Sequence, residues 1–355
     1  MQINLSINAR KGENPITETA LVTGATGFVG SHLCRLLLET GYRVQALHRP
    51  ASSLTLLQGL DVERIVGDVT RPETLYPALK GVDVVFHTAS RVDYWRGADG
   101  MYQVTVEGTW NVLQAALEAG ARRVVYTSSV AALGVPAYPC KKRPVQPVYL
   151  NENHVWNYKP RWWRYGHAKY LAEQKVQWAV ARGLDVVIVN PAMILGPGDV
   201  NRISGELVIL MSRGIVPFSI AGGMNAIHVD DVARGHLLAL ERGSTGERYI
   251  LGGENLTYLE MFQLTAEIAG MRPPTVVIPA GMLRPFAGLL DFLCHFVPLP
   301  FNGDLLRFAG RFLYYDTSKA QRVLGLKGLK PIRTAIQETW DWYYQQGWIT
   351  RRPGG

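Results

Sequence analysis

Apolar residues in the first half of the chain occur in short runs that alternate with helical patterns. Six of these runs predict strands, at residues 19–22, 42–47, 63–66, 82–87, 123–127 and 184–189. Between them lie segments such as 106–120, where Val106, Val112, Leu113 and Leu117 recur near helical spacing. Strand–helix alternation over this length predicts an α/β fold, a doubly wound parallel sheet with helices on both faces.

The pattern becomes less regular after about Asn190, where Pro, Gly and short mixed segments follow. We therefore predict three parts of the chain. Residues 1–18 form an N-terminal extension, and residues 19–190 form the sheet domain. Residues 191–355 form mainly a smaller, irregular substrate-binding lobe, some of whose strands and helices return to the core.

Composition limits the class of protein. Hydrophobic residues make up 47% and charged residues 19% of the 355 residues, which is typical of a folded globular chain. The three cysteines, Cys34, Cys140 and Cys294, are too few and too scattered for a disulfide framework or a zinc site. This usage and the lack of an apolar N-terminal stretch predict a cytoplasmic protein without a signal peptide or metal.

The charge balance favours an anionic small molecule as the ligand. Lys and Arg outnumber Asp and Glu by 37 to 29, a net charge of +8. The densest basic runs, at 141–143 and 161–164, lie in one central stretch, and no long basic block occurs. A nucleic-acid partner is therefore not expected.

The most apolar region spans residues 280–301. It is interrupted by Arg284, Pro285, Asp291 and His295, so it does not predict an integral membrane segment. We interpret it as a lid or a pair of helices beside the substrate. The alternative is a surface that meets a membrane or a hydrophobic substrate, so peripheral membrane contact stays open.

A glycine motif follows the first predicted strand. Gly24, Gly27 and Gly30 form G-x-x-G-x-x-G at the start of a helical pattern. Glycines let the backbone turn tightly and let a pyrophosphate approach the N–H groups of the helix N-terminus. The motif predicts that the sheet domain is a dinucleotide-binding, Rossmann-type domain.

The end of the second strand indicates which dinucleotide binds. An acidic residue there would bind the adenosine ribose of NAD, but this chain has His48 and Arg49. An arginine can pair with a 2′-phosphate that a carboxylate would repel. We therefore predict NADP as the cofactor, with NAD the weaker alternative. Asp68 is either an acceptor for the adenine amino group or the cap of a turn.

Tyr165 and Lys169 lie four residues apart at a predicted helix start, in YGHAK, and therefore on one helix face. An ammonium beside a phenol favours the phenolate, so we expect Lys169 to lower the pKa of Tyr165 and make it an acid/base group. Upstream, Ser128 and Ser129 end a predicted strand, where a hydroxyl can bind a substrate carbonyl.

These segments together resemble the extended short-chain dehydrogenase/reductases, the NAD-dependent epimerase/dehydratase family. The resemblance is to its dihydroflavonol-4-reductase-like branch, which includes proteins called hopanoid-associated sugar epimerases. It runs from about Ala20 to the C-terminus. The matching segments are TGATGFVG at 23–30, GDVT at 67–70, FHTAS at 86–90, VEGTWNVLQAA at 106–116, YTSS at 126–129, YGHAK at 165–169, NPAMILGPGD at 190–199, HVDDVA at 228–233 and YYDTSKAQRVLG at 314–325.

The resemblance implies roles for individual residues. Ser129, rather than Ser128, would polarise the carbonyl, Tyr165 would transfer the proton, and Lys169 would hold the nicotinamide ribose and tune Tyr165. The residues implied to bind the cofactor are Gly24, Thr26, Gly27, Phe28, Val29, Gly30, His48, Arg49, Asp68, Val69, Thr88, Ala89, Ser90, Tyr165, Lys169, Pro191, Ala192 and Met193. It also implies a homodimer through helices near 106–119 and 168–181.

Two departures from the family pattern bear on chemistry. Thr105 stands where the family often has Asn, so bracing between helix and strand there must use another group. Val130 and Ala131 follow Ser129, so the acid/base set of sugar-nucleotide dehydratases is missing.

Three functions remain open. The favoured one is an NADP-dependent oxidoreductase that reversibly reduces a ketone or aldehyde, and the apolar 280–301 stretch favours a hydrophobic substrate. The second is an NAD-dependent nucleotide-sugar epimerase, and the third is a non-catalytic dinucleotide-binding protein.

Aromatic and basic residues are concentrated before Tyr165, at Trp156 and 161–164. They form either an aromatic and cationic rim for the substrate or ordinary loop packing. His154, His167 and His228 have no metal-ligand spacing. We expect His228 at a helix start or in the core, and Asp230 and Asp231 in the first turn of a helix.

Overall fold

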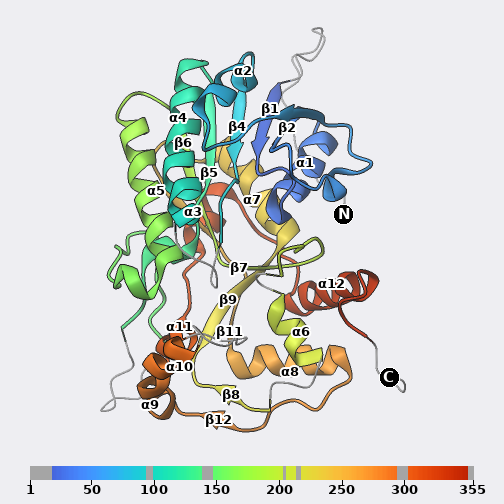
Figure 1. Cartoon of the computed structure of the whole chain (residues 1–355), viewed down its shortest axis with the longest axis vertical. Coiled ribbons are helices and arrows are strands. Elements are labelled where there is room, and N and C mark those ends of the chain that lie inside the picture. The colour runs from blue at the N-terminus through green and yellow to red at the C-terminus, as the bar shows by residue number, and fades with distance from the viewer. Residues whose placement is uncertain are drawn as a thin grey trace.

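A seven-stranded, fully parallel sheet forms the core of the upper part of the computed structural model (Figure 1). Its strand order is β3-β2-β1-β4-β5-β6-β10. The structure describes residues 18–92, 99–137, 147–202, 205–212, 217–293 and 303–350. The strands are β1 (Thr19–Thr23), β2 (Arg43–His48), β3 (Glu63–Val66), β4 (Val84–His87), β5 (Arg123–Thr127), β6 (Val186–Pro191) and β10 (Arg248–Leu251). The predicted doubly wound α/β fold is confirmed.

Successive side chains of each inner strand face opposite sides of the sheet, and both sides are covered by helices. Ala20 and Val22 pack under α1 (Phe28–Glu39) and α7 (Val229–Arg242). Leu21, between them, packs under the helices of the other face. Those helices are α2 (Leu75–Leu79), α4 (Gly108–Glu118) and α5 (Arg164–Val180). Burial on both faces explains why the inner strands read as continuous apolar runs.

Element boundaries differ from the sequence pattern by a few residues. Helix α1 begins at Phe28, within the glycine motif, and α5 begins at Arg164, so Tyr165 lies in its first turn. Helix α4 continues a π-helical segment, Gln103–Glu107, which follows α3 (Asp99–Tyr102).

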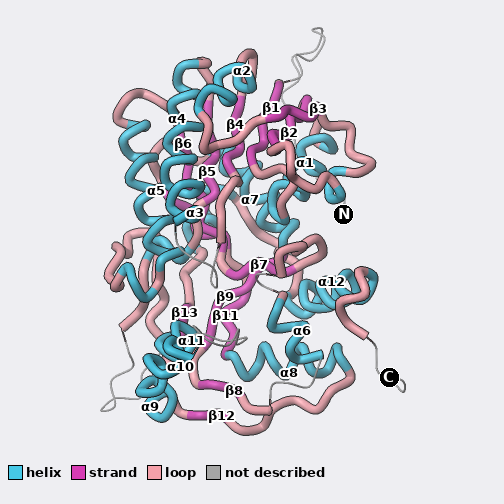
Figure 2. Tube along the Cα trace, in the orientation of Figure 1, coloured by secondary structure: helices cyan, strands magenta, loops and turns pink. Residues whose placement is uncertain are grey.

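The chain leaves the main sheet at Ala192. Strand β6 ends at Pro191, and β7 (Met193–Leu195) begins a second sheet around β9 (Gly223–His228). Strand β9 also pairs with β11 (Glu254–Thr257) and β13 (Phe312–Leu313). Helix α7 and strand β10, which pairs with β6, then return to the main domain. Figure 2 shows α7 beside the strands of the main sheet. The predicted division at 190/191 falls at this crossing and stays a prediction.

Helices surround the second sheet. Helix α12 (Ile332–Gln345) packs Ile336 and Trp340 into a core with Met261 of α8 (Tyr258–Ala269). Strands β8 (Ser219–Ile220) and β12 (Val277–Ile278) pair at the edge of the lobe. The remaining helices are α6 (Glu206–Ser212), α9 (Ala280–Leu283), α10 (Ala287–Leu293) and α11 (Gly303–Phe308).

Some sequence predictions lie outside the described residues. These are most of the N-terminal extension, Cys140, Cys294, the basic run at 141–143 and the end of the apolar stretch after residue 293. Over the part of the chain that the structure covers, no helix has both the length and the apolar character needed to cross a bilayer. The predicted dimer faces, on α4 and α5, lie side by side on one face of the sheet (Figure 1), and the dimer stays a prediction.

Candidate functional site

The carboxyl ends of the parallel strands bring the predicted site residues to one edge of the sheet. Strands β1, β2, β4, β5 and β6 all point to this edge, so their last residues and the loops that follow lie near one another. Strand order reverses between β1 and β4, and ligands of open α/β sheets bind in the crevice at such a reversal.

The turn between β1 and α1 fits a dinucleotide pyrophosphate. Gly24 has φ +67°, and a Cβ on it would lie 2.7 Å from the backbone nitrogen of Ala89. A Cβ on Gly30 would lie 2.2 Å from the carbonyl oxygen of Gly24. Helix α1 has Gly27 as N-cap, no capping side chain and no acidic residue in its first turn. Its first N–H groups are thus left for an anion, and Thr26, Phe28 and Val29 lie in the same turn.

The loop after β4 packs directly against this turn. Thr88 donates its Oγ1 proton to the carbonyl of Thr23 (2.7 Å), and the N–H of Ala89 donates to Thr23 Oγ1 (3.3 Å). Ser90 Oγ lies 3.3 Å from Thr105 Oγ1. These bonds hold residues 88–90 beside the glycine turn, where the resemblance implies that they line the cofactor.

The ends of β2 and β3 carry the predicted adenosine-side residues. His48 ends β2, and Arg49 is exposed immediately after it. Asp68 Oδ1 accepts hydrogen bonds from the N–H (2.9 Å) and hydroxyl (2.8 Å) of Thr70. At least one oxygen of Asp68 therefore caps a turn, the alternative considered for it. Val69 is buried beside them, and its carbonyl accepts from Asn111 (2.9 Å).

The structure brings Ser129, Tyr165 and Lys169 together where β5 ends and α5 begins. Ser129 and Tyr165 are hydrogen-bonded through their side chains. Ser129 also caps a 3₁₀ turn, Val130–Leu133, accepting from the N–H of Ala131 (3.1 Å). Lys169 is buried one turn along α5, and its Nζ donates to the carbonyl of Thr127 (2.8 Å).

The predicted depression of the Tyr165 pKa is wrong for this structure. Burial raises the pKa of Tyr165 above its usual value of 10, and the hydrogen bond with Ser129 opposes that rise only in part. The expected effect of Lys169 is absent because its ammonium is itself desolvated and is directed at Thr127. Tyr165 is therefore protonated at neutral pH, the state that a proton donor needs.

Burial lowers the pKa of Lys169 to about 7, against the opposing attraction of Glu173. Its ammonium lies over the Tyr126 ring, 5.3 Å from the centroid. A lysine with this pKa can be charged or neutral near neutral pH, and it has N–H donors besides the one directed at Thr127.

Sequence reasoning missed Glu173, a fully buried carboxylate one turn beyond Lys169. It accepts from the Ser128 hydroxyl and from Asn190 Nδ2 (2.7 Å), and it pairs with Arg248 of β10 (2.7 Å). Asn190 Nδ2 also donates to the carbonyl of Ser129 (2.9 Å). The available signal was a glutamate at i+4 from Lys169 on an otherwise apolar helix face. The network joins α5 to the ends of β5, β6 and β10.

The bracing that Asn would supply at position 105 comes from other side chains. His87, buried at the end of β4, bonds Thr23 Oγ1 (2.7 Å) and Thr109 Oγ1 (3.0 Å). The Thr109 hydroxyl in turn lies 2.6 Å from the carbonyl of Thr105. This chain of contacts connects β1, β4 and α4 behind the site.

Pro191, Ala192 and Met193 lie where the chain passes from the main sheet to the second sheet. Pro191 ends β6, and the N–H of Ala192 donates to the carbonyl of Leu251 (2.9 Å). Met193 begins β7. The segment predicted to pack beside the nicotinamide thus lies between the two sheets.

The aromatic residues before Tyr165 pack on one another. Trp156 lies 6.1 Å from Trp163 and 5.7 Å from His167, between ring centroids. His167 Nδ1 bonds the hydroxyl of Tyr102 (3.0 Å). Trp162 has the cations Lys159 and Arg161 over its ring. Loop packing therefore accounts for Trp156 and Trp163, whereas Trp162 carries a cationic rim.

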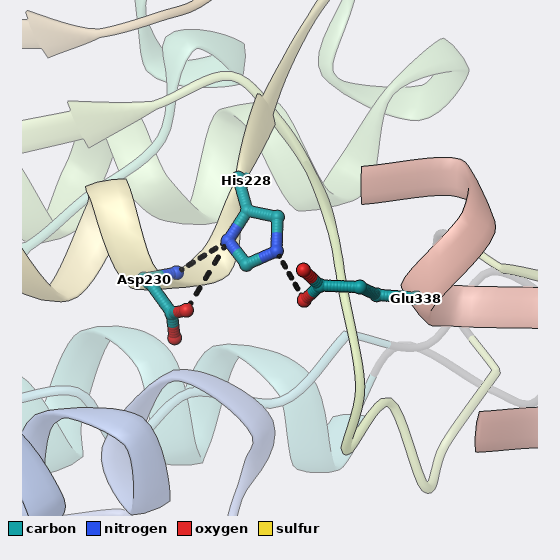
Figure 3. A group of neighbouring side chains, drawn as sticks. All are labelled: His228, Asp230 and Glu338. Atoms are coloured by element: carbon teal, nitrogen blue, oxygen red, sulfur yellow. Dashed lines mark hydrogen bonds and ion pairs between the residues drawn. The ribbon is translucent and has the colours of Figure 1, made fainter. Parts of the chain in front are cut away.

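His228 belongs to a polar cluster between α7 and α12 (Figure 3). It is the N-cap of α7: its Nδ1 accepts from the N–H of Asp230 (3.0 Å), and its Nε2 faces Glu338 (2.9 Å). Lys330 Nζ lies 2.8 Å from Asp230 and 3.4 Å from Glu338. His228, Asp230 and Glu338 are close enough to share a metal, but the Nδ1 lone pair is used and Lys330 supplies the positive charge. As predicted from sequence, His228 starts a helix and Asp230 and Asp231 lie in its first turn.

Lys169→Met should stabilise the fold at pH 7 and do so less at higher pH. The unfolded lysine has a pKa near 10.4, about three units above the folded value. Between pH 7 and about pH 10 the unfolded chain holds more protons than the folded chain, so the free energy of unfolding of the wild type rises with pH. The advantage of methionine over lysine therefore shrinks as the pH rises. Urea unfolding at pH 7 and about pH 9.5 tests this, with Lys175→Met on the same helix as control. A gain that is equal at both pH values would contradict the prediction.

Glu173→Leu should lower the free energy of unfolding by about 3 kcal/mol, because it leaves the guanidinium of Arg248 without its counter-charge. Arg248→Met in the same chain should recover much of that loss. The measurement is urea unfolding of both single variants and the double variant. Strictly additive losses would show that the two groups are not coupled.

Known proteins similar to this chain identify its family. The profile of the NAD dependent epimerase/dehydratase family matches residues 20–252. A putative dihydroflavonol 4-reductase of Synechocystis sp. is 36% identical over 92% of this chain and 95% of its own. Sterol demethylase protein B of Methylococcus capsulatus is 34% identical over 93% of this chain and 100% of its own.

Among solved structures, that of gox2253 superimposes with a TM-score of 0.82 at 36% identity, over 94% of this chain and 100% of its own. The matched range, residues 20–252, spans the glycine turn, Ser129, Tyr165 and Lys169. The chain therefore belongs to the NAD-dependent epimerase/dehydratase family and is an NAD(P)-dependent oxidoreductase of the extended short-chain dehydrogenase/reductase type.

Proposed function

We propose that the chain is an NADP-dependent reductase that converts a ketone or aldehyde into an alcohol, reversibly. The observation that supports this most directly is the hydrogen bond between Ser129 and Tyr165 beside the buried ammonium of Lys169. Two adjacent hydroxyl groups of this kind can both contact one carbonyl oxygen, which supports the proposal. The catalytic residues of the proposal are Ser129, Tyr165 and Lys169.

In this proposal the cofactor occupies the glycine turn and the strand ends beside it. Gly24, Thr26, Gly27, Phe28, Val29 and Gly30 hold the pyrophosphate, and His48 and Arg49 bind the 2′-phosphate. Asp68 and Val69 contact the adenine, Thr88, Ala89 and Ser90 support the nicotinamide side, and Pro191, Ala192 and Met193 flank its ring. When bound, the nicotinamide supplies or accepts the hydride.

The side chains move the proton and stabilise charge. Ser129 donates a hydrogen bond to the substrate carbonyl and polarises it. Tyr165, whose pKa burial keeps above 10, gives its proton to the oxygen as negative charge develops there. Lys169, turned from Thr127 toward the nicotinamide ribose, places a positive charge near the resulting phenolate.

NADP rather than NAD is proposed because of the charge at the end of β2. Arg49 is exposed, and residues 43–50 include no acidic side chain. An exposed guanidinium can form paired hydrogen bonds with a phosphate. Two relatives are named after a dihydroflavonol and a sterol, which supports a hydrophobic carbonyl or alcohol as the substrate.

Tyr165→Phe should lower kcat by roughly 10²- to 10⁴-fold, because only the proton-donating hydroxyl is lost. The Kd for NADPH should stay within a few-fold of wild type. The assay is NADPH oxidation with the carbonyl found in a screen of ketones and aldehydes, with Tyr170→Phe on the same helix as control. Turnover of the variant close to that of the wild type would remove Tyr165 from the mechanism. A wild type that reduces no carbonyl in the screen would favour the non-catalytic dinucleotide-binding alternative.

Calorimetry on nucleotide-free protein should show tighter binding of NADPH than of NADH. Arg49→Asp should weaken NADPH binding by about 10- to 100-fold, since a charge-assisted hydrogen bond is lost and a repulsion is added. Arg43→Asp, at the other end of the same strand, is the matched control. If NADH binds better, or NAD resists removal, the nucleotide-sugar epimerase becomes the better proposal.

A further inference from the structure

The segment from α9 to α10 has its hydrophobic face outward. Every exposed residue from 281 to 293 lacks charge and hydrogen-bonding side-chain groups: Gly281, Met282, Pro285, Phe286, Gly288, Leu289, Phe292 and Leu293. Met282 is 64%, Phe286 57% and Leu289 54% exposed. The spacing of Met282, Phe286, Leu289 and Leu293 is 4, 3 and 4 residues, which aligns them in one stripe on the helical segment.

The charged residues of this segment are bound to other parts of the protein. Arg284 Nε donates to the carbonyl of Ala309 (3.2 Å). Asp291, whose side chain is 39% exposed, accepts from the N–H of Gly303 (2.9 Å) and is paired with Arg307. Apolar side chains therefore make up most of the exposed surface of this segment, unlike that of an ordinary surface helix. An exposed apolar stripe of this kind marks an interaction surface.

The stripe continues along the edge of the lobe. Val276 (60% exposed) and Val277 (40%) lead into α9 through β12, and Phe218 (42%) precedes β8, the partner of β12. Helices α9, α10 and α11 and the strands β8 and β12 lie together at the bottom of Figure 1. We call the exposed apolar residues 218, 276, 277, 282, 286, 289 and 293 the apolar edge.

Three cations surround Trp162 beside the apolar edge: Lys159 and Arg161 are exposed, whereas Arg307 is mostly buried and paired with Asp291. Lys159 Nζ is 4.4 Å, Arg161 Cζ 5.4 Å and Arg307 Cζ 5.6 Å from the centroid of the Trp162 ring. Arg307 connects this group to α10 through Asp291. Tryptophan, lysine and arginine next to exposed apolar side chains are the composition of proteins that lie in a membrane interface.

We propose that the apolar edge and the cations around Trp162 dock the protein on the surface of an anionic lipid membrane, without crossing it. Charge favours lipid over a second copy of the chain. A two-fold interface through this edge would contain each exposed cation twice, and no exposed residue of 281–293 is acidic to compensate them. Anionic head groups would instead neutralise them, while the apolar side chains enter the acyl boundary. The segment 159–163 leads directly into α5 and Tyr165, so the docked surface adjoins the proposed catalytic residues.

The test is flotation of the full chain with phosphatidylcholine vesicles, with and without phosphatidylglycerol. Wild type should bind the anionic vesicles at least about 10-fold more tightly, given about 1 kcal/mol for each basic residue at the surface. Phe286→Ser/Leu289→Ser should lower that affinity by about 10- to 100-fold. Leu117→Ser/Val323→Ser removes exposed apolar residues elsewhere and should bind as wild type does.

Lys159→Glu/Arg161→Glu separates charge from apolar burial. It should reduce binding to anionic vesicles by about 10- to 30-fold and leave the weak binding to neutral vesicles unchanged. Thermal unfolding and NADPH calorimetry on each variant confirm that the fold and the cofactor site are intact.

Three results would overturn the proposal: wild type that does not float with either vesicle, equal binding to both vesicles, or Phe286→Ser/Leu289→Ser that floats as wild type does. Lipid-free sedimentation in which Phe286→Ser/Leu289→Ser abolishes a wild-type dimer would assign the edge to a second copy instead. Failure of the vesicle test leaves the reductase proposal standing, because none of the three double variants alters Ser129, Tyr165 or the glycine turn.

Discussion

The buried carboxylate of Glu173 is the point on which the site depends. It joins α5, which carries Tyr165 and Lys169, to Ser128 directly after β5, Asn190 on β6 and Arg248 on β10. A charge without contact with water needs partners on every side, so this one holds four elements in a single arrangement. The hydroxyls of Ser129 and Tyr165 meet because the hydrogen bonds and the ion pair of Glu173 fix helix α5 against the strand ends.

The same arrangement explains the unusual state of Lys169. The helix that presents it also buries it, and burial lowers the pKa of its ammonium to about 7. Glu173, one turn further, limits that fall. A lysine exposed on the same helix would have its ordinary charge but could not reach the carbonyl of Thr127 at the end of β5. Stability and chemistry therefore compete at this position, which is a common feature of functional sites.

The two lobes are joined by polar clusters as well as by the chain crossing at Ala192. His32 of α1 bonds Asp230 of α7 (2.7 Å) and the carbonyl of Pro197 (2.8 Å). Lys330 and Glu338 add the region of α12 to the same cluster. These contacts connect the glycine-turn helix with the second lobe, so the cofactor side and the substrate side of the proposed site share one set of hydrogen bonds. The apolar edge lies on a different part of the second lobe, at β8, β12, α9 and α10, and takes no part in these contacts.

Local pattern by itself determined the strand–helix alternation, the parallel sheet, the glycine turn and the Tyr165–Lys169 spacing, because each depends on residues close together in the sequence. Only the tertiary structure decided the partners of Glu173 and the direction in which burial moves the Tyr165 pKa. It also revealed the packing of Trp156 and Trp163 and the outward face of residues 281–293. Burial and charge pairing both depend on segments that are distant in the sequence. The ion pairs of Glu173 with Arg248 and of Asp291 with Arg307 are examples. Periodicity cannot show which side of a helix the fold will cover, since both sides of 280–293 are rich in apolar residues.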